Sequence, residues 1–131
     1  MPSTSIVIVN WNACDHLRRC LASLAGCDAS IVVVDNASDD GSADMVETEF
    51  PNARILRQEV NSGFAGGVNA GAAATRGDYV LVLNPDIVAA PGAVQRLTAF
   101  LDAHPESGAA AGLLVDGSGQ EPFPADVAME G

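Results

Sequence analysis

Near the N-terminus the sequence reads Ile6-Val7-Ile8-Val9-Asn10-Trp11-Asn12, four β-branched residues followed by two amides and an indole. An apolar run of this length without polar alternation is typical of a strand that is buried on both faces, as in a parallel sheet covered by helices. The abrupt change at Asn10 predicts that the strand ends there, in a loop that carries polar side chains.

The same order of strand, polar loop and helix recurs along the chain. Further apolar runs predict strands at 31–34, 54–58, 79–83 and 109–115. Apolar residues at helical spacing predict four helices between them, with Leu17, Cys20, Leu21 and Leu24 in the first, Met45, Val46 and Phe50 in the second, Val68, Ala72 and Ala73 in the third, and Val94, Leu97, Thr98 and Leu101 in the fourth. Four buried strands that alternate with helices predict a doubly wound α/β fold, a mostly parallel sheet with helices on both faces.

Local signals predict where the helices begin and end. We expect Gly26 to stop the first helix and Asp40 or Ser42 to cap the second. Pro91 suits the first position of the fourth helix, where its missing N–H has no intrahelical partner to lose.

The composition limits the functional classes. The 131 residues predict one domain over 1–131, with an irregular tail at 117–131. Six arginines, no lysine and seventeen acidic residues give a net charge of −11, which argues against nucleic acid as a partner. Cys14, Cys20 and Cys27 form no C-x-x-C pair and are expected to be reduced thiols. No stretch has the length of a membrane helix, so we expect a cytoplasmic protein.

Polar residues follow each of the first four predicted strands. In an open parallel sheet, ligands bind beyond the carboxyl ends of the strands, close to the point where the strand order reverses. The candidates at this edge are Asn10, Trp11 and Asn12, then Asp35 and Asn36, then Asn61 and Ser62, and finally Asn84 and Asp86. Short carboxylates and amides indicate a binding and coordinating site rather than covalent catalysis.

Two common nucleotide-binding motifs are excluded. A dinucleotide fold needs G-x-G-x-x-G directly after the first strand, where this chain has Asn10-Trp11-Asn12-Ala13-Cys14. A phosphate-binding loop of the G-x-x-x-x-G-K type needs a lysine, and the chain has none.

Four motifs in a fixed order carry a family resemblance. They read I-V-I-V-N-W-N (6–12), V-V-D-N-A-S-D-D-G-S (33–42), N-S-G-F-A-G-G-V-N-A-G (61–71) and G-D-Y-V-L-V-L-N-P-D (77–86). Together they resemble glycosyltransferase family 2, and within it the rhamnosyltransferase-like branch. The resemblance implies a GT-A fold and a hexosyltransferase that moves a sugar from a nucleotide-diphosphate donor to an acceptor hydroxyl, usually with inversion.

The resemblance also implies roles for single residues. Asp35 would hold the nucleobase, while Asn10 and Trp11 would line the base and ribose. Asn61 and Gly63 belong to the glycine-rich donor-binding turn. Asn84 and Asp86 match the D-x-D position of the family, where Asp86 would bind a divalent metal, magnesium or manganese, that neutralises the diphosphate. Asn84 replaces the first acid of that motif and removes one charge from the site.

Each of these residues also has a plain structural alternative. Asp35 and Asp86 could be turn residues, and Trp11 could cover the sheet edge. The glycines of 61–71 could serve a tight turn and close packing of helix on sheet.

The resemblance covers only part of the family's usual domain. The family's general base is an Asp in an acidic motif that has no match here, so no catalytic base is assigned. We expect the chain to be the N-terminal nucleotide-sugar-binding part of a glycosyltransferase, without its acceptor-binding half. The alternative is a non-catalytic nucleotide or nucleotide-sugar binding module completed by a partner chain.

The partners follow from the same resemblance. It favours dTDP-rhamnose or a UDP-sugar as donor. A saccharide or lipid-linked saccharide acceptor would bring the protein to the inner face of the membrane. A sheet that lacks its later strands would expose an unpaired edge or apolar surface, which a homodimer would relieve.

Overall fold

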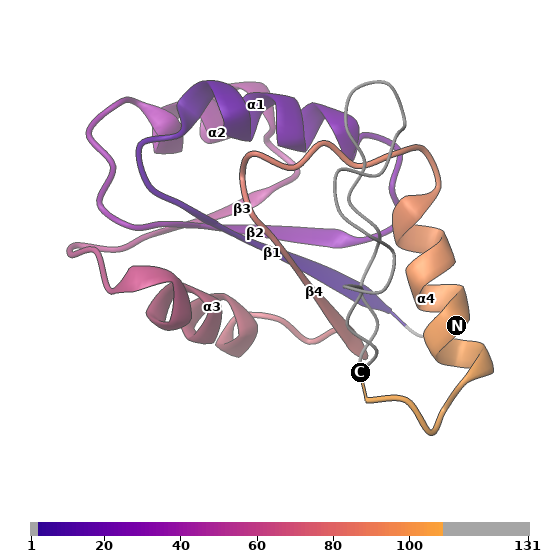
Figure 1. Cartoon of the computed structure of the whole chain (residues 1–131). Coiled ribbons are helices and arrows are strands. Elements are labelled where there is room, and N and C mark those ends of the chain that lie inside the picture. The colour runs from indigo at the N-terminus through magenta and orange to yellow at the C-terminus, as the bar shows by residue number, and fades with distance from the viewer. Residues whose placement is uncertain (1–2, 109–131) are drawn as a thin grey trace, which may run out of the picture. The chain divides into compact units, whose positions relative to one another are not determined.

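The computed structural model describes residues 3–108 (Figure 1). The elements are β1 (Thr4–Asn10), α1 (Cys14–Ser23), β2 (Ser30–Asp35), α2 (Ser42–Glu49), β3 (Arg54–Arg57), α3 (Gly63–Ala73), β4 (Tyr79–Leu83) and α4 (Ala93–Ala103). They fall into a first compact unit, Met1–Pro91, and a second unit that begins at Gly92 and contains α4. The predicted strand at 109–115 and tail at 117–131 lie outside the described residues, and the single domain over 1–131 stays a prediction. Within the described part, every helix is too short or too polar to cross a lipid bilayer.

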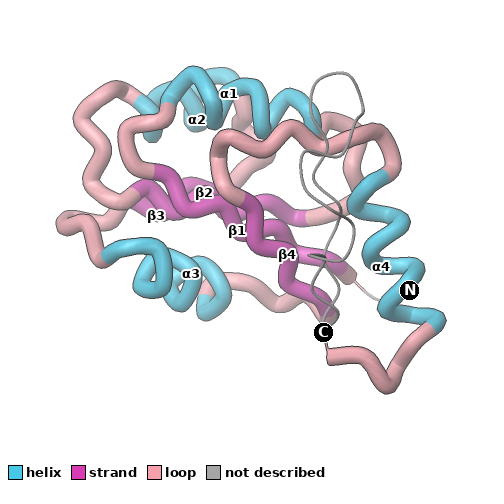
Figure 2. Tube along the Cα trace, viewed as in Figure 1, coloured by secondary structure: helices cyan, strands magenta, loops and turns pink. Residues whose placement is uncertain are grey.

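The sheet of the first unit confirms the predicted doubly wound architecture. Its strands are parallel and lie in the order β3-β2-β1-β4. From β1 the chain moves outward to β2 and β3, then returns through α3 and places β4 on the other side of β1. Figure 2 shows α1 and α2 on one face of the sheet and α3 on the opposite face. The strand order therefore reverses between β1 and β4.

The core lies on both faces of the two central strands. All seven residues of β1 are buried, as its unbroken apolar run predicts. On one face, Val7, Val9, Val32 and Val34 form a cluster against α3. Because side chains alternate along a strand, Ile6 and Ile8 point to the other face, which α1 and α2 cover.

Helix α3 lies on the sheet through two buried glycines, and the predicted Val68 packs partly buried against the same core cluster. Gly67 and Gly71, one helical turn apart, are its buried residues, whereas the predicted Ala72 and Ala73 are exposed. A Cβ on Gly71 would lie 2.4 Å from Cγ1 of Val7, and one on Gly67 would lie 2.5 Å from Cγ1 of Val9. These glycines let the helix backbone approach the central strands closely.

The outer strands are less buried than predicted. In β4, Val80 is 45% exposed and Val82 is 37% exposed. The register pairs Ser5 with Val80 and Val7 with Val82, so both valines share the sheet face that carries α3. Since α3 packs on β1 and β2, it leaves this part of β4 uncovered. The prediction of four fully buried strands is therefore wrong for β4, and β3 also has exposed ends.

Three predicted helix boundaries need correction. Helix α1 ends at Ser23, and Gly26 lies in the turn beyond it with φ of +80°. The N-cap position of α2 is Gly41, with φ of +83°, between the predicted Asp40 and Ser42. Gly92, with φ of +77°, separates Pro91 from α4. Gly41 and Gly92, the N-cap residues of α2 and α4, adopt the left-handed conformation that side chains disfavour, and this sets the start of both helices. Gly26 adopts the same conformation three residues beyond the end of α1.

The packing of α3 predicts the effect of adding one methyl group. We expect Gly71→Ala to lower the free energy of unfolding by about 1–3 kcal/mol, because the new Cβ overlaps the stiff side chain of Val7. In the background of Val7→Ala the same substitution should cost clearly less. Urea-induced unfolding of the four proteins of this double-mutant cycle measures the difference.

Gly108→Ala is the matched control, since a Cβ there meets nothing within 4 Å. It should change the free energy of unfolding by no more than about 0.5 kcal/mol. A Gly71→Ala protein as stable as the wild type would contradict the close packing of α3.

Candidate functional site

The carboxyl ends of β1 and β2 are joined by a buried polar pair. Asn10 and Asp35 are partners in the parallel register, and Asn10 Nδ2 donates a hydrogen bond of 3.1 Å to Asp35 Oδ1. Asn10 is fully buried and Asp35 is 3% exposed. The backbone continues the link, because the Asn36 N–H donates to the Asn10 carbonyl at 2.8 Å. Two of the predicted site residues are therefore held together at the centre of the sheet edge.

The loops that follow these strands interlock. The Asn12 N–H donates to Ser38 Oγ at 2.9 Å, and the Asp39 N–H donates to Asn12 Oδ1 at 2.9 Å. Asn12 and Ala37 both have positive φ, +48° and +61°. Asparagine tolerates this conformation, whereas for alanine it costs about 1–2 kcal/mol. Trp11, which directly precedes Asn12, has 57% of its surface exposed.

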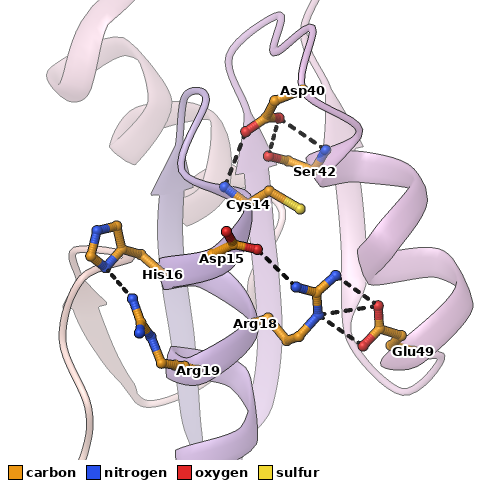
Figure 3. Close-up of polar contacts among 8 residues, drawn as sticks. All are labelled: Cys14, Asp15, His16, Arg18, Arg19, Asp40, Ser42 and Glu49. Carbon is orange, nitrogen blue, oxygen red and sulfur yellow. Dashed lines mark hydrogen bonds and ion pairs between the residues drawn. The ribbon is translucent and has the colours of Figure 1, made fainter.

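Asp40 links the N-termini of α1 and α2 (Figure 3). Its Oδ2 accepts the Cys14 N–H at 3.0 Å, and its Oδ1 accepts the Ser42 N–H at 3.0 Å and the Ser42 hydroxyl. Partial burial raises the pKa of Asp40, but these hydrogen bonds outweigh it and leave the pKa below its usual value. A carboxylate at two helix N-termini is also favoured by both helix dipoles. The sequence suggested a cap for α2 alone.

A surface ion pair joins the same two helices further along. Arg18 of α1 donates from Nε to Glu49 Oε1 at 3.0 Å and from Nη1 to Asp15 Oδ1 at 3.0 Å (Figure 3). The bond to Glu49 and the charge of that carboxylate raise the pKa of Arg18. The Arg18–Glu49 pair connects α1 to α2, the Arg18–Asp15 pair lies within α1, and both are exposed enough to contribute little to stability.

The glycine-rich turn is tied to the end of β2. Gly63 has φ of +78°, and its N–H donates to Asn61 Oδ1 at 2.8 Å. Its carbonyl accepts Asn36 Nδ2 at 3.0 Å. Asn61 and Gly63 therefore form the turn that opens α3, and Asn36 connects this turn to the sheet.

Two amide oxygens of the site are buried and unsatisfied. Oδ1 of Asn10 and Oδ1 of Asn36 have no hydrogen-bond partner in the part of the chain that the structure describes. Asn36 is only 2% exposed. An unsatisfied buried acceptor costs about 1–3 kcal/mol, and in native proteins such groups often mark functional positions. Asn36 was visible in the sequence only as a polar residue after a strand.

Asn84 and Asp86 lie on the other side of β1, after β4, and both are exposed. The Cys20 thiol of α1 lies 4.0 Å from the Asn84 carbonyl. Burial, together with the charge of Asp86, raises the pKa of Cys20 to about 11. The loop is also held by the Ala89 N–H, which donates to Ser23 Oγ at 2.9 Å. Asp86 is therefore positioned beside α1, next to the point where the strand order reverses.

The donor set near Asp86 is small. Within residues 3–108, no group of three or more His, Cys, Asp or Glu side chains could hold a metal ion. Mg²⁺ usually keeps several waters and is bound through one or two carboxylates and the phosphates of a substrate. The single carboxylate of Asp86 fits a metal that binds together with a diphosphate and does not fit a permanently held ion.

The structure brings the predicted residues to one edge of the sheet. Asn10 and Asp35 are joined directly, Trp11 follows Asn10 in the chain, and Asn61 and Gly63 are connected to the sheet through Asn36. Asn84 and Asp86 follow the neighbouring strand β4. A separate hollow of about 320 Å³ lies at the opposite edge and contains none of them; its lining includes Leu21, Leu24, Cys27, Ile31, Glu49 and Phe50.

Comparisons with known proteins agree with this architecture. Residues 5–126 match the sequence model of the family described as Glycosyl transferase family 2. The N-acetylglucosaminyl-diphospho-decaprenol L-rhamnosyltransferase of Mycobacterium tuberculosis is 32% identical over 128 residues, which cover 87% of this chain and 42% of that protein. The succinoglycan biosynthesis protein ExoO of Rhizobium meliloti is 30% identical over 107 residues, covering 79% of this chain and 31% of ExoO.

A solved structure is similar over the same region. The crystal structure of residues 1–349 of S. aureus TarS in complex with UDP-GlcNAc superposes with a TM-score of 0.71 and 25% identity. The match covers 78% of this chain and 32% of the TarS chain. The chain thus spans less than half the length of these relatives.

The double contact of Asp40 predicts a pH-dependent contribution to stability. We expect Asp40→Asn to lower the free energy of unfolding at neutral pH by about 1 kcal/mol, because the amide leaves one helix-terminal N–H without an acceptor. The pKa of Asp40 in the folded chain lies below the unperturbed 3.8. The contribution of Asp40 to the free energy of unfolding is therefore fully present above pH 3.8 and is lost as the pH falls through the folded pKa.

Urea-induced unfolding at about pH 7, 5 and 3 measures the difference in free energy of unfolding between the wild type and Asp40→Asn. This difference should be equal at about pH 7 and 5 and smaller at about pH 3. Asp39→Asn is the matched control, because the Asp39 carboxylate makes no hydrogen bond to any described residue. A difference that grows toward low pH would show that Asp40 does not cap the helices as described.

Proposed function

Because the chain belongs to glycosyl transferase family 2, we propose that its first unit binds the donor of a sugar transfer, a nucleotide-diphosphate sugar. The observation that carries the proposal is the order β3-β2-β1-β4, which reverses between β1 and β4. Ligands of open α/β sheets bind at such a reversal, beyond the carboxyl ends of the strands. Asn10 and Asp35 end the neighbouring strands β1 and β2, and Asp86 follows β4 on the other side of the reversal.

The base would bind on the β2 side of this edge. Each oxygen of Asp35 already accepts one hydrogen bond, from Asn10 Nδ2 and from the Ser38 N–H. A carboxylate oxygen has a second lone pair, so Asp35 can still accept from a ring N–H. Uracil and thymine both carry such a group, and the exposed indole of Trp11 offers a flat surface for the base or ribose.

The sugar of the donor is proposed from the relatives. The Mycobacterium tuberculosis relative is by name a rhamnosyltransferase, and TarS was crystallised with UDP-GlcNAc. These two support dTDP-rhamnose or a UDP-sugar as the donor of this chain. The glycine-rich turn of Asn61 and Gly63 would approach the donor from the α3 side.

The diphosphate would bind near β4 through a divalent metal. The chain has no lysine, and Asp86 supplies an exposed carboxylate beside the reversal point. Magnesium or manganese bound there with the diphosphate would offset its charge and that of the leaving group. Asn84 contributes an uncharged amide where a second carboxylate would add repulsion.

The transfer itself would replace the nucleotide at the anomeric carbon by an acceptor hydroxyl, a hexosyl transfer with inversion. A saccharide or lipid-linked saccharide is the proposed acceptor, and the inner face of the membrane the proposed place of action. No residue is assigned as the general base, and the homodimer stays a prediction.

The alternative function is a module that binds the donor without transferring its sugar. Binding and transfer assays on the same protein distinguish the two functions.

Titration calorimetry with nucleotides tests the proposed donor site. We expect UDP or dTDP to bind more tightly with manganese than without it. Asp86→Ala should remove the manganese-dependent gain and leave the metal-free affinity unchanged within about twofold, because this carboxylate contacts the metal and not the base.

Asp28→Ala is the control, since Asp28 is an exposed carboxylate just before β2, at the opposite edge of the sheet. It should behave like the wild type. The proposal fails if UDP, dTDP and GDP all fail to bind with manganese present, and the metal assignment fails if Asp86→Ala keeps the full gain.

A further inference from the structure

We infer that Ser38 is a positioning residue for the nucleobase, one that holds the Trp11 turn and the Asp35 carboxylate in a fixed arrangement. The inference rests on the proposed donor site. The juxtaposition that carries it is a single serine in contact with Asn10 and Asp35, the last residues of β1 and β2, and with Asn12 in the loop after β1.

The two polar groups of Ser38 act on different loops. Its hydroxyl accepts the Asn12 N–H at 2.9 Å and lies 3.4 Å from Asn10 Nδ2, so it contacts the loop after β1. Its backbone N–H donates to Asp35 Oδ2 at 3.0 Å, which orients the carboxylate at the end of β2. A substitution of the side chain therefore removes the first contact and keeps the second.

The backbone is bent to make these contacts possible. Ala37 has φ of +61°, a conformation that alanine rarely adopts. The next residue, Ser38, donates its backbone N–H to Asp35 Oδ2. On the facing loop, Asn12 has φ of +48°. Backbone strain of this kind persists only where surrounding contacts hold it, and it gathers at binding and catalytic sites.

The position of Trp11 depends on these contacts. Its neighbour Asn10 is fixed in the buried strand, and its neighbour Asn12 is held by Ser38 Oγ and the Asp39 N–H. With 57% of its own surface exposed, the Trp11 side chain has few packing contacts to define its place. Without the Ser38 hydroxyl, the turn would sample other conformations, and the binding of a base would have to order it again.

The experiment compares Ser38→Ala, Ser38→Thr and Ser30→Ala. Threonine keeps the hydroxyl. Ser30 is a matched control because, among residues 3–108, its hydroxyl makes one hydrogen bond, with the Ser5 hydroxyl at the opposite end of the same strand pair. Calorimetry with UDP and dTDP, at a temperature where all variants are folded, should show binding about tenfold weaker for Ser38→Ala. Ser38→Thr and Ser30→Ala should stay within about twofold of the wild type.

A second measurement reports the turn without any ligand. Trp11 is the only tryptophan of the chain, so time-resolved fluorescence anisotropy follows its local motion directly. We expect a larger amplitude of fast motion in Ser38→Ala than in the other proteins. A loss of stability alone would leave the indole of the folded protein equally ordered.

The outcomes separate this inference from the proposed function. If the wild type binds neither nucleotide, the proposed donor site is wrong, and the anisotropy still shows whether Ser38 orders Trp11. If the wild type binds and Ser38→Ala matches it in affinity, Ser38 positions nothing that the base uses. Weaker binding with unchanged anisotropy would likewise overturn the assignment.

Discussion

The hydrogen bond between the Asn10 amide and the Asp35 carboxylate is the contact on which the site depends. It joins two strands that are buried on both faces and that end at the same register position. A buried carboxylate is costly unless donors surround it, and here the donors come from Asn10 and from the backbone of Ser38. The need to satisfy one buried charge thus draws both following loops together.

The core and the site are connected through α3. Because Gly67 and Gly71 let this helix lie close to Val7 and Val9, the helix packs over the central strands. The chain then continues into β4 on the far side of β1, which creates the reversal of strand order. The turn that opens α3 is held to β2 by Asn36. Close packing on this face of the sheet therefore goes together with a turn, at Asn61 and Gly63, that lies beside the carboxyl end of β2.

The sequence predicted what depends on local pattern and missed what depends on contacts between distant segments. Buried strands such as Ile6–Val9 carry their own signal, and parallel pairing then places Asn10 and Asp35 at one edge. Glycine carries no hydropathy signal, so Val68 was predicted on the inner side of α3 but Gly67 and Gly71 were not. The Ser38–Asn12 contact joins residues 26 positions apart, and the Cys14 N–H accepted by Asp40 spans the same separation. The exposure of Val80 and Val82 in β4 could not be predicted either, because it depends on where α3 packs on the sheet.

The acidic residues of the edge differ in how their charge is balanced. Asp35 is buried and accepts two donors, and Asp40 accepts from the N-termini of two helices. Asp86 is exposed and makes no hydrogen bond or ion pair with any residue between 3 and 108. Burial raises the pKa of Cys20, and the charge of Asp86 adds to that rise. A cation gains most from a carboxylate whose charge no protein donor has already neutralised. Among these three acids, that condition holds for Asp86, and it favours the β4 side of the reversal for a metal-bound diphosphate.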